Sequence, residues 1–564
     1  MTEPNDERSA TPGNAASVNE PGLFAPLSEP VFRRIWTASL GSNFGLLIVS
    51  VAAAWEMTRL SDSPGMVALV QTAIMSPFMV FSMFAGALAD VFDRRSLSLV
   101  SLGFPIFGAI ALTMTSAMGI SSPASLLGLC FVVGFGLALF SPSWQASVGE
   151  QVSAPLLPSA IALNGISFNI ARSVGPALGG ILVAAVGVVY TFGVTTLLYI
   201  PLLIALLMWK RAKEVSRLPP ESLRSAILVG LRYATNSPRL IHMLMRAFLL
   251  GFAIASLYGL MPLIARDLLG GGPQLFGLLL AAFGIGAVIG AFSINALSRW
   301  AGPEWSIRIS IVLMALSIVG IAVSDTQWVT LILLVVAGAA WMAAATIFNV
   351  LVQTGSPRWV TARALGMFQT MIAGGLALGS WAWGSLADVV GLQVALLCSS
   401  GAMLIFLIHG LIRPVAEEDG QTSPIAEHLP DPDIAMAISG RSGPITIELE
   451  YRVDPDQARP FFRIMEELGR SKRRNGARMW RLARDLADPA LWVERYRHET
   501  WDDYLRHRQR QTVDERRLQG EANNLSDPGY PVIRRLLDRP TGSVRWTDSA
   551  PDRGDSDMVR PMVG

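Results

Sequence analysis

The residue best placed to do chemistry is Arg172, a lone cation in a long apolar stretch. Residues 151–171 and 173–209 contain no other charged residue. In a helix that begins near residue 157, Arg172 would lie about 21 Å along the axis. A guanidinium at that depth in lipid is costly and normally faces a polar cavity or a partner. We predict that Arg172 binds an anionic substrate or takes part in gating; a structural partnership with a helix end or an aspartate is the alternative.

Polar and small residues surround Arg172 in the same predicted helix. Asn164, Phe168 and Arg172 recur at four-residue spacing and therefore share one helix face. The string Gly175-Pro176-x-x-Gly179-Gly180 combines small residues, which let a neighbouring helix approach closely, with a proline that permits a bend. Close packing without a functional role is the alternative to a role in binding or gating. The residues we predict to bind substrate or to gate are Asn164, Asn169, Arg172, Gly175, Pro176 and Gly179.

A second charged group lies at the end of an earlier apolar segment. Asp90 is followed by Arg94 and Arg95 within residues 86–95, which read Gly-Ala-Leu-Ala-Asp-Val-Phe-Asp-Arg-Arg. At a half-wet boundary a carboxylate and a guanidinium attract by about 1 to 4 kcal/mol, which is enough to bias a two-state equilibrium. We predict a gating role for Asp90, Arg94 and Arg95. The alternative is that the two arginines only orient the chain in the membrane.

The composition indicates what must hold these residues in place. Only 16% of the 564 residues are charged and 51% are hydrophobic, against about 25% charged residues in a typical soluble protein. Residues 31–413 contain 20 Lys and Arg and 11 Asp and Glu, whereas residues 414–564 contain 24 and 27. A long apolar block with a polar tail excludes a single soluble domain, a disordered chain and a disulfide-stapled secreted protein. The net charge of +2 gives no indication of nucleic-acid binding, and we expect no cofactor and no metal.

About twelve segments of the apolar block are long enough to span a bilayer as helices. They are approximately residues 32–59, 64–89, 96–119, 123–150, 157–185, 187–210, 239–266, 273–298, 305–324, 326–354, 359–388 and 391–412. The halves also echo each other, because residues 175–179 match 375–379 and Asn169 matches Gln369. We predict an all-α polytopic membrane protein with two six-helix repeats and a binding site between them.

Basic residues gather in every second connection of this series, around Arg94, residues 210–239, Arg299 and Arg358. Positively charged connections stay in the cytoplasm, so we expect both termini to be cytoplasmic. The predicted parts are a disordered tail (1–30), a first bundle (31–210), a cytoplasmic loop (211–238) and a second bundle (239–413).

The polar tail predicts a small α+β domain. Residues 414–443 have the composition of a flexible linker. Residues 445–453 alternate apolar and polar side chains, as a half-buried strand does. A helix to about residue 469, strands near 477–485 and 491–500, a charged helix near 501–519 and a strand near 531–537 complete the order βαββαβ. This order predicts a ferredoxin-like domain over 444–540, followed by a disordered tail over 541–564. The basic cluster at the end of the first helix of this domain is expected to be solvated, with contact to anionic lipid as the alternative: Arg470, Lys472, Arg473 and Arg474.

Residues 86–95 resemble the signature of the major facilitator superfamily, in which a glycine, three residues, an aspartate and a basic pair connect the second and third helices. Val91 and Asp93 depart from it, so the charge network must be partly rewired. The string 175–180 resembles the fifth-helix signature of drug and metabolite exporters of that superfamily. Residues 139–147, 160–165, 169–176 and 362–366 resemble the enterobactin-exporter-like branch of that superfamily, whose members are also called transmembrane secretion effectors.

The resemblance implies proton-driven export of a small organic molecule, of siderophore or drug type, across a bacterial inner membrane by alternating access. It also implies that the first, fourth, seventh and tenth helices line the cavity. Each candidate could instead make a contact between helices. The cavity candidates are Asn43, Trp144, Gln145, Tyr258, Trp341, Asn349 and Gln369. Glu56 lies within the first helix, and an ion pair with Arg59 is the favoured interpretation, with proton coupling as the alternative.

The tail domain resembles the antibiotic-biosynthesis-monooxygenase-like domain that some secretion effectors carry. His498 and His507 could serve an oxidation pocket or bind an aromatic ligand, but surface histidines are the favoured interpretation, and we expect no catalysis. A sheet of this kind often dimerises, so a homodimer is a possible assembly. The alternatives to an exporter are a transporter-derived sensor or scaffold and a transporter fused to a monooxygenase-like enzyme.

Overall fold

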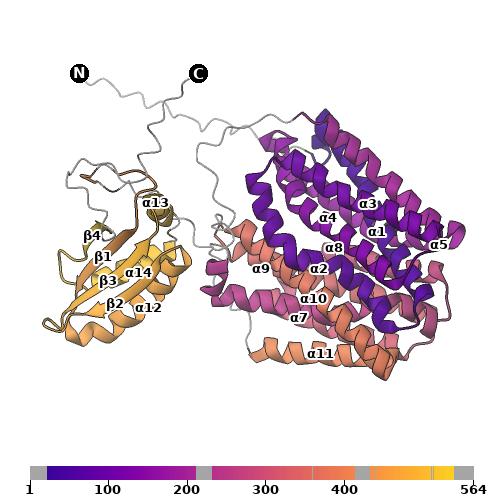
Figure 1. The fold of residues 1–564 in the computed structure, drawn as a ribbon. Helices are drawn as coiled ribbons and strands as arrows, with labels where there is room; N and C mark the ends of the chain where they lie inside the picture. The colour runs from indigo at the N-terminus through magenta and orange to yellow at the C-terminus, as the bar shows by residue number, and fades with distance from the viewer. Residues whose placement is uncertain are drawn as a thin grey trace, which may run out of the picture.

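The computed structural model describes residues 22–210, 231–357 and 360–412, and in the C-terminal part residues 432, 434–436, 438–509, 511 and 513–538. It contains a bundle of long helices and, beside one end of that bundle, a small domain built on a four-stranded sheet (Figure 1). We call the second part the sheet domain. Most of the predicted loop 211–238, most of the linker 414–443 and most of both tails lie outside the described residues.

Five helices form the first half of the bundle. They are α1 (Pro30–Leu60), α2 (Pro64–Val91), α3 (Arg94–Ala117), α4 (Pro123–Ser147) and α5 (Leu157–Met208). Ser63, Asp93 and Ser122 cap α2, α3 and α4 by accepting hydrogen bonds from free backbone N–H groups. Gly187, with φ 82°, interrupts α5, so α5 comprises two arms. The short 3₁₀ turns around these helices are η1 (Ala25–Ser28), η2 (Val148–Glu150) and η3 (Ala154–Leu156).

The second half of the bundle repeats this plan. It comprises α7 (Pro238–Leu263), which runs into the π-helical turn η4 (Ile264–Leu268), then α8 (Pro273–Val323), α9 (Gln327–Thr354), α10 (Thr361–Val390) and α11 (Leu392–Ile412). Gly302, with φ 74°, divides α8 as Gly187 divides α5. Within the described residues, nine helical segments are long and apolar enough to cross a membrane. In this count α5 is one segment, whereas the two arms of α8 are counted separately. Counting both arms of α5 and adding α10 and α11 gives the twelve predicted segments.

The glycines that repeat in the sequence make the same contact in each half. Gly175 and Gly179 bring the first arm of α5 against α1, where a Cβ would lie 3.1 Å from Leu47 and 3.2 Å from Val51. Gly375 and Gly379 bring α10 against the backbone of α7 at Phe248 and Phe252. The predicted fold class, with two six-helix repeats, is therefore confirmed.

Two interfaces join the halves, one between α5 and α8 and one between α2 and α10. In the first, Gly180 lies against Gly277, and the Ser173 hydroxyl donates to the Gly284 carbonyl at 3.2 Å. In the second, Gly65 lies against Gly384, and the Thr72 hydroxyl donates to the Ala377 carbonyl at 2.9 Å. Each helix separates its glycine contact from its hydrogen bond by seven residues, or two helical turns. The two interfaces are thus built alike.

These contacts lie toward one end of the bundle. We call the end where α1 finishes and α2 begins the far end, because it lies away from the sheet domain (Figure 1). There Arg266 donates to the Thr58 carbonyl at 2.9 Å and the rings of Trp55 and Phe276 stack. Near the opposite end of α2, α5 and α10, a Cβ would meet no atom of the described structure within 4 Å at three glycines, Gly86, Gly165 and Gly366. The helices of the two halves are therefore in closest contact from the middle of the bundle to the far end.

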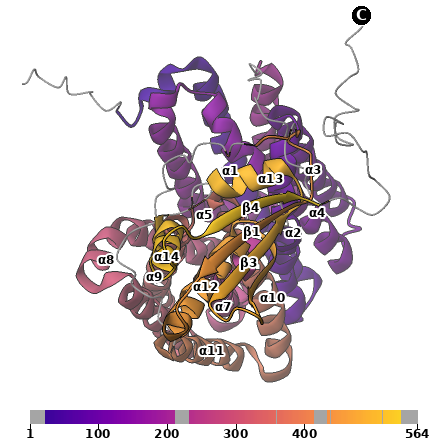
Figure 2. The same ribbon diagram turned by 90° about the vertical axis from the view of Figure 1, so that its left-hand side faces the viewer.

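The sheet domain has the predicted order of elements. Its strands β1 (Ile445–Arg452), β2 (Arg478–Arg484), β3 (Leu491–His498) and β4 (Val532–Leu537) form an antiparallel sheet in the order β2-β3-β1-β4. A 3₁₀ turn, η5 (Pro455–Gln457), leads into α12 (Ala458–Arg474), which packs on one face with α14 (Val513–Asn524) (Figure 2). This is the ferredoxin-like arrangement. The single charged helix predicted near 501–519 is wrong, because α13 (Trp501–Gln509) ends before α14 begins.

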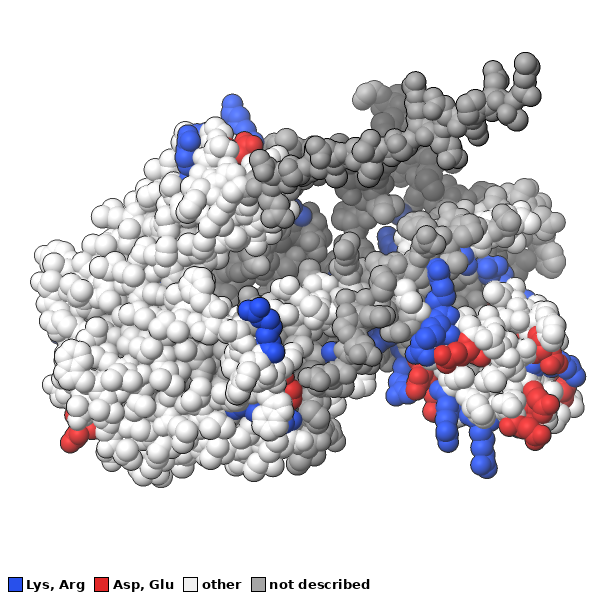
Figure 3. Space-filling model, turned by 180° about the vertical axis from the view of Figure 1, so that it is seen from behind, with Lys and Arg blue, Asp and Glu red and all other residues white. Residues whose placement is uncertain are grey.

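Charge divides the molecule as the sequence indicates. The visible face of the bundle carries few Lys, Arg, Asp or Glu side chains, whereas they crowd the sheet domain (Figure 3). The two parts touch at residues 231–235, which are helical and precede α7. Arg232 donates to the Gly476 carbonyl at 3.3 Å, and the Arg474 guanidinium lies 6.0 Å from the centre of the Tyr233 ring. The sheet domain therefore contacts the chain at the entry to the second half.

Candidate substrate site between the two halves

The centre of the bundle holds a hydrogen bond between the halves. Arg172 of α5 donates from Nη2 to the hydroxyl of Tyr258 of α7 at 2.8 Å. The Tyr258 ring packs edge-on against Phe283 and Trp341, with centroids 5.3 and 6.3 Å apart. Three of the predicted residues, Arg172, Tyr258 and Trp341, therefore lie together, although they come from three helices.

Helix periodicity explains why Arg172 points to the centre. On one side of it in helical projection, Gly175 and Gly179 face α1, and on the other side Ser173 and Gly180 face α8. Arg172 lies between these contacts and is half-buried. Among the described side chains no carboxylate forms an ion pair with it. Its one described hydrogen-bond partner is a neutral phenol, so no group in the described ranges compensates the charge of Arg172.

The remaining fifth-helix candidates lie nearer the sheet-domain end of α5. Asn164 and Asn169 are half-buried, and the Asn169 carbonyl accepts a hydrogen bond from Ser173 at 3.0 Å. Phe168, one turn from Arg172 on the same face, is 42% exposed. Asn43 of α1 donates to the Ser167 hydroxyl at 3.1 Å, which joins two helices of the first half. Asn43 therefore makes the helix–helix contact that was its alternative interpretation.

The other cavity candidates do not reach Arg172 in the described contacts. Trp144 stacks on Phe140 with centroids 5.6 Å apart. Gln145 donates to Ser141 at 3.1 Å, and Asn349 accepts from Gln353 at 2.8 Å, each within its own helix. Gln369 is exposed. The structure thus brings together only part of the predicted set.

The predicted gating residues lie where α2 meets α3. Arg94 donates to Glu150 at 2.8 Å and to the Ala146 carbonyl at 3.0 Å. Arg95 donates to the carbonyls of Leu206 and Leu207 at 2.8 and 2.6 Å. These contacts all lie within the first half and connect the start of α3 to the C-terminal ends of α4 and α5. Asp90 lies in the last turn of α2, and its side chain falls outside the described part of the structure.

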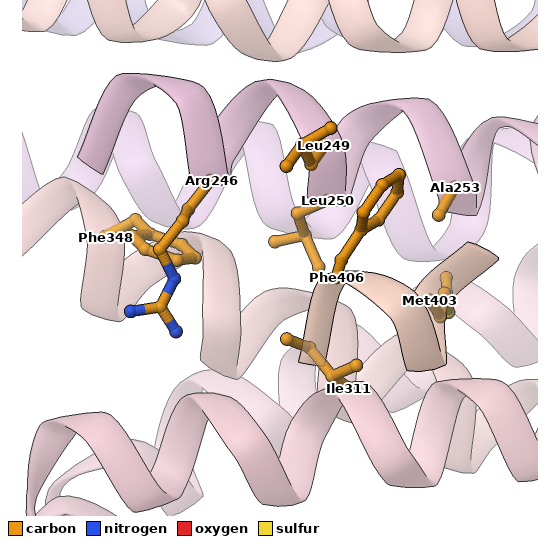
Figure 4. A pocket seen from close by; sticks show the side chains of 8 residues that line it. All are labelled: Arg246, Leu249, Leu250, Ala253, Ile311, Phe348, Met403 and Phe406. Atoms are coloured by element: carbon orange, nitrogen blue, oxygen red, sulfur yellow. The ribbon is translucent and has the colours of Figure 1, made fainter. Parts of the chain in front are cut away.

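A buried ion cluster in the second half was missed. Arg246 donates through both terminal nitrogens to Glu304, at 2.8 and 3.1 Å, and Arg308 donates to the same carboxylate at 3.0 Å. Arg246 and Glu304 are each less than a tenth exposed. In Figure 4, Arg246 projects from α7 beside Phe348, along a small pocket lined by apolar side chains. Two signals for it were in the sequence: Arg246 is a lone charge within an apolar segment, and Glu304 is followed by Arg308 four residues later.

Two acidic groups lie toward the far end. Glu56 accepts from Arg59 at 3.2 Å, so the favoured ion pair is present, and both border a cavity of about 430 Å³ beside the Gly187 turn. Asp388, at the end of α10, accepts from the Ser63 hydroxyl at 2.8 Å and from the Gly65 N–H at 3.1 Å. Because Ser63 and Gly65 begin α2, Asp388 caps a helix of the opposite half. This contact was also missed.

The sheet domain has a polar interior. Lys472 is 2% exposed and pairs with Glu494 at 2.8 Å, and Trp480 and Tyr451 donate to the same carboxylate. Lys472 is therefore buried, and its predicted place in a solvated cluster is wrong. His498 is also buried, so its favoured surface position is wrong, and burial lowers its pKa to about 4.

The second histidine of the sheet domain, His507, is buried as well. Its ring centroid lies 4.9 Å from that of His498. Within the described ranges no group of three or more His, Cys, Asp or Glu could hold a metal ion.

A family model described as "Transmembrane secretion effector" matches residues 21–541. The chain belongs to that family. Its members are transporters of the major facilitator superfamily, and the match extends over the sheet domain as well as the bundle.

Two relatives of this secretion effector are exporters by name. Multidrug efflux pump Tap of Mycolicibacterium fortuitum is 24% identical over 400 residues, which cover 68% of this chain and 95% of that protein. Enterobactin exporter EntS of Salmonella choleraesuis is 26% identical over 405 residues, which cover 71% and 96%.

Solved structures agree with this secretion effector in fold. Nucleoside transporter NupG has a TM-score of 0.55 at 15% identity, covering 68% of this chain and 99% of that one. A bacterial homologue of the lysosomal transporter Spinster, in an inward-facing and unoccupied conformation, has a TM-score of 0.54 at 12% identity, covering 69% and 95%. At these identities the likeness concerns the fold alone. The protein is therefore a multi-pass membrane transporter with exporters among its relatives.

Proposed function

We propose that this secretion effector is a proton-coupled exporter of a small organic molecule, such as a siderophore, a drug or a secondary metabolite, that works by alternating access. The observation that carries the proposal is the Arg172–Tyr258 hydrogen bond, a charged contact between the halves midway along the bundle. A guanidinium at that depth is expensive unless it serves a polar cavity. The names of Tap and EntS support export rather than uptake.

We further infer that the cavity opens at the sheet-domain end and that this end is cytoplasmic. The contacts between the halves from the middle of the bundle to the far end support the first point, as does the fold shared with the Spinster homologue in its inward-facing conformation. The basic residues of the connections support the second. Both termini would then be cytoplasmic, with the protein in the bacterial inner membrane.

Opening and closing would use the groups at the two ends. We assign Asp90, Arg94 and Arg95 to the gate at the sheet-domain end, where Arg94 and Arg95 already fasten α3 to α4 and α5. The contact of Asp388 with the start of α2 would hold the far end closed. Glu56 and Asp388 are the acids we propose to test for proton coupling, because both lie on the side from which protons would enter.

We assign no chemistry to the sheet domain. Its histidines and aromatic residues are parts of its core, which supports a structural or regulatory role over a monooxygenase activity. Dimerisation through the sheet stays a prediction. It would use the face that bears Arg495, Arg497 and Arg534, opposite α12 and α14.

The test is efflux from cells and transport by sealed vesicles. Small molecules retained by cells that lack the protein are identified by mass spectrometry against cells that produce it. Inside-out vesicles then receive those molecules with and without an imposed pH gradient. We expect uptake that needs the gradient and falls at least tenfold in Arg172→Gln. Absence of any protein-dependent movement would favour a sensor or scaffold instead.

A further inference from the structure

We propose that the substrate is an organic anion bearing an aromatic ring, and that its anionic group replaces the Tyr258 hydroxyl on Arg172. The inference rests on the proposed transport function and adds the chemical class of the substrate. If the anionic group replaces the Tyr258 hydroxyl, substrate binding also breaks the hydrogen bond that joins the two halves at Arg172.

The charge of Arg172 is the first argument. The other well-buried or half-buried arginines of the bundle whose contacts are described have oxygen partners with negative charge or strong dipoles. Arg246 pairs with Glu304, Arg94 with Glu150, and Arg95 with two helix-end carbonyls. Arg172 has one neutral phenol. A cation in a low-dielectric setting gains most from an anion, so a negatively charged group is the ligand that Arg172 would bind most strongly.

The geometry of the guanidinium is the second argument. Arginine offers five N–H donors in a plane, and the contact with Tyr258 uses a single nitrogen. A carboxylate, phenolate or sulfonate can accept two of these donors side by side, in a charge-assisted pair roughly twice as strong as a neutral hydrogen bond. The incoming anion therefore outcompetes the Tyr258 hydroxyl.

The aromatic part follows from the neighbouring surface. Phe168 lies one turn from Arg172 on the same face of α5, toward the end we propose to be open, and is 42% exposed. An apolar ring exposed beside a cation suits a ligand that is flat and apolar at one end and charged at the other. Tyr258, released from Arg172, keeps its ring contacts with Phe283 and Trp341, which belong to the second half.

Binding would then change the interface between the halves. The Arg172–Tyr258 bond joins α5 to α7, so its replacement by a substrate bond removes one contact across the centre. The remaining described contacts run from the middle of the bundle, at Ser173, toward the far end, at Thr72. A ligand that weakens the closed arrangement shifts the equilibrium by its differential affinity for the two states.

The test uses three naphthalene probes of similar size and different charge on the purified full-length protein: 2-naphthoate, 2-naphthamide and 2-naphthylmethylammonium. Binding is followed by thermal shift and by quenching of intrinsic fluorescence. We expect saturable binding of 2-naphthoate only. In Arg172→Gln the affinity for 2-naphthoate should fall at least tenfold, whereas Arg34→Gln, which removes an exposed charge at the start of α1, should leave it unchanged.

Tyr258→Phe separates replacement from simple contact. If the substrate displaces the Tyr258 hydroxyl, the phenylalanine variant loses a competitor and binds 2-naphthoate more tightly, by about three- to tenfold. If Tyr258 instead helps to bind the anion, affinity falls. Tyr199→Phe is the matched control, since the buried Tyr199 hydroxyl has no hydrogen-bond partner among the described residues.

The outcomes distinguish this inference from the proposed function. Equal binding of the three probes, binding of none, or weaker binding by Tyr258→Phe would overturn the inference. Protein-dependent efflux of neutral or cationic metabolites would leave the exporter standing and still overturn it. Selective anion binding without any transport in vesicles would support the site and overturn the exporter.

Discussion

Gly180 of α5 and Gly277 of α8 lie so close that a Cβ on Gly180 would stand 2.7 Å from the Cα of Gly277. The same Cβ would be 2.6 Å from the Pro273 carbonyl oxygen. Real Cβ atoms do not approach backbone this closely, so the two halves can meet here only because both positions lack a side chain. The contact belongs to the α5–α8 interface, whose counterpart between α2 and α10 pairs Gly65 with Gly384.

Adding one methyl group at this point should force the interface apart. We expect Gly180→Ala to reduce transport about tenfold and to raise the accessibility of far-end positions, measured by labelling of single cysteines from outside. Gly165→Ala is the control, because a Cβ at Gly165 in the same helix meets no described atom within 4 Å. Unchanged far-end accessibility in a well-folded Gly180→Ala would show that this contact does not close the bundle.

Removing the Asp388 carboxylate should loosen the far end by another route. Asp388 accepts hydrogen bonds from Ser63 and Gly65 at the start of α2, where a helix favours negative charge. Because Asp388 is exposed, we expect the loss in Asp388→Ala to be about 1 kcal/mol, which changes the ratio of closed to open molecules roughly fivefold. Distances between spin labels on Leu60 and Val389 would report it.

Asp325→Ala is a suitable comparison for Asp388→Ala, since Asp325 lies before α9 and bonds to its neighbour Thr326. We expect Asp325→Ala to leave the distance between the spin labels at positions 60 and 389 unchanged. Identical distance distributions for Asp388→Ala and the unsubstituted protein would contradict the assigned role of Asp388.

The buried pair of Lys472 and Glu494 should be essential to the sheet domain. In Lys472→Met the Glu494 carboxylate stays buried without its cation, which costs about 3 to 5 kcal/mol. Hydrogen exchange of the β1 and β3 amides in the full-length protein would show this as faster exchange. Glu521→Gln, which removes an exposed partner of Arg517, should change the same amides little.

Acid should weaken the sheet domain through His498. Burial lowers its pKa to about 4, against about 6.5 in an unfolded chain. The unfolded state therefore binds the proton more readily, so the stability from neutral His498 is complete above pH 6.5 and is lost as the pH falls toward 4. The difference corresponds to about 3 kcal/mol. Hydrogen exchange at pH 7.5 and 4.5 should show this loss, and His498→Gln should show less of it.

The helices were predictable because lipid imposes a length and an apolar composition on each one. Their ends lie at the prolines and glycines that punctuate the sequence, as at Pro64 and Gly187. The repeat of residues 175–179 at 375–379 was equally legible, because close helix contacts demand small residues at fixed places. Arg172 stood out because a charge in such surroundings needs a reason.

The contacts of Asp388 and Glu304 could not be predicted in the same way. The Asp388 contact depends on which helix of the other half packs against α10, and the Glu304 contact depends on which helix of the same half packs against α8. The periodicity of a single helix does not indicate its neighbours. Asp388 does end the string Gly384-x-x-x-Asp388, with the spacing of Gly86 and Asp90. The repeat of this spacing marks Asp388 as the counterpart of Asp90 in the second half.

The sheet domain shows a different source of error. Residue type alone predicts that Lys472 and His498, as charged or titratable groups, lie in water, whereas both are buried. The alternation of β3 was the better guide, because Trp492, Glu494 and Tyr496 share the face on which His498 lies. The place of a residue on the strand predicts its burial better than its residue type does, when a buried partner can pair with the side chain.

The contact between Arg232 and Gly476 has a mechanical consequence. Residues 231–235 lead within three residues into α7, so the sheet domain is in contact with the second half of the bundle, and we expect it to move with that half. A small rotation of that half in the membrane becomes a wide arc at the outer edge of the domain. A fluorophore attached at the fully exposed position 486 would therefore change its orientation each time the second half rotates, and its fluorescence anisotropy would follow the transport cycle outside the membrane.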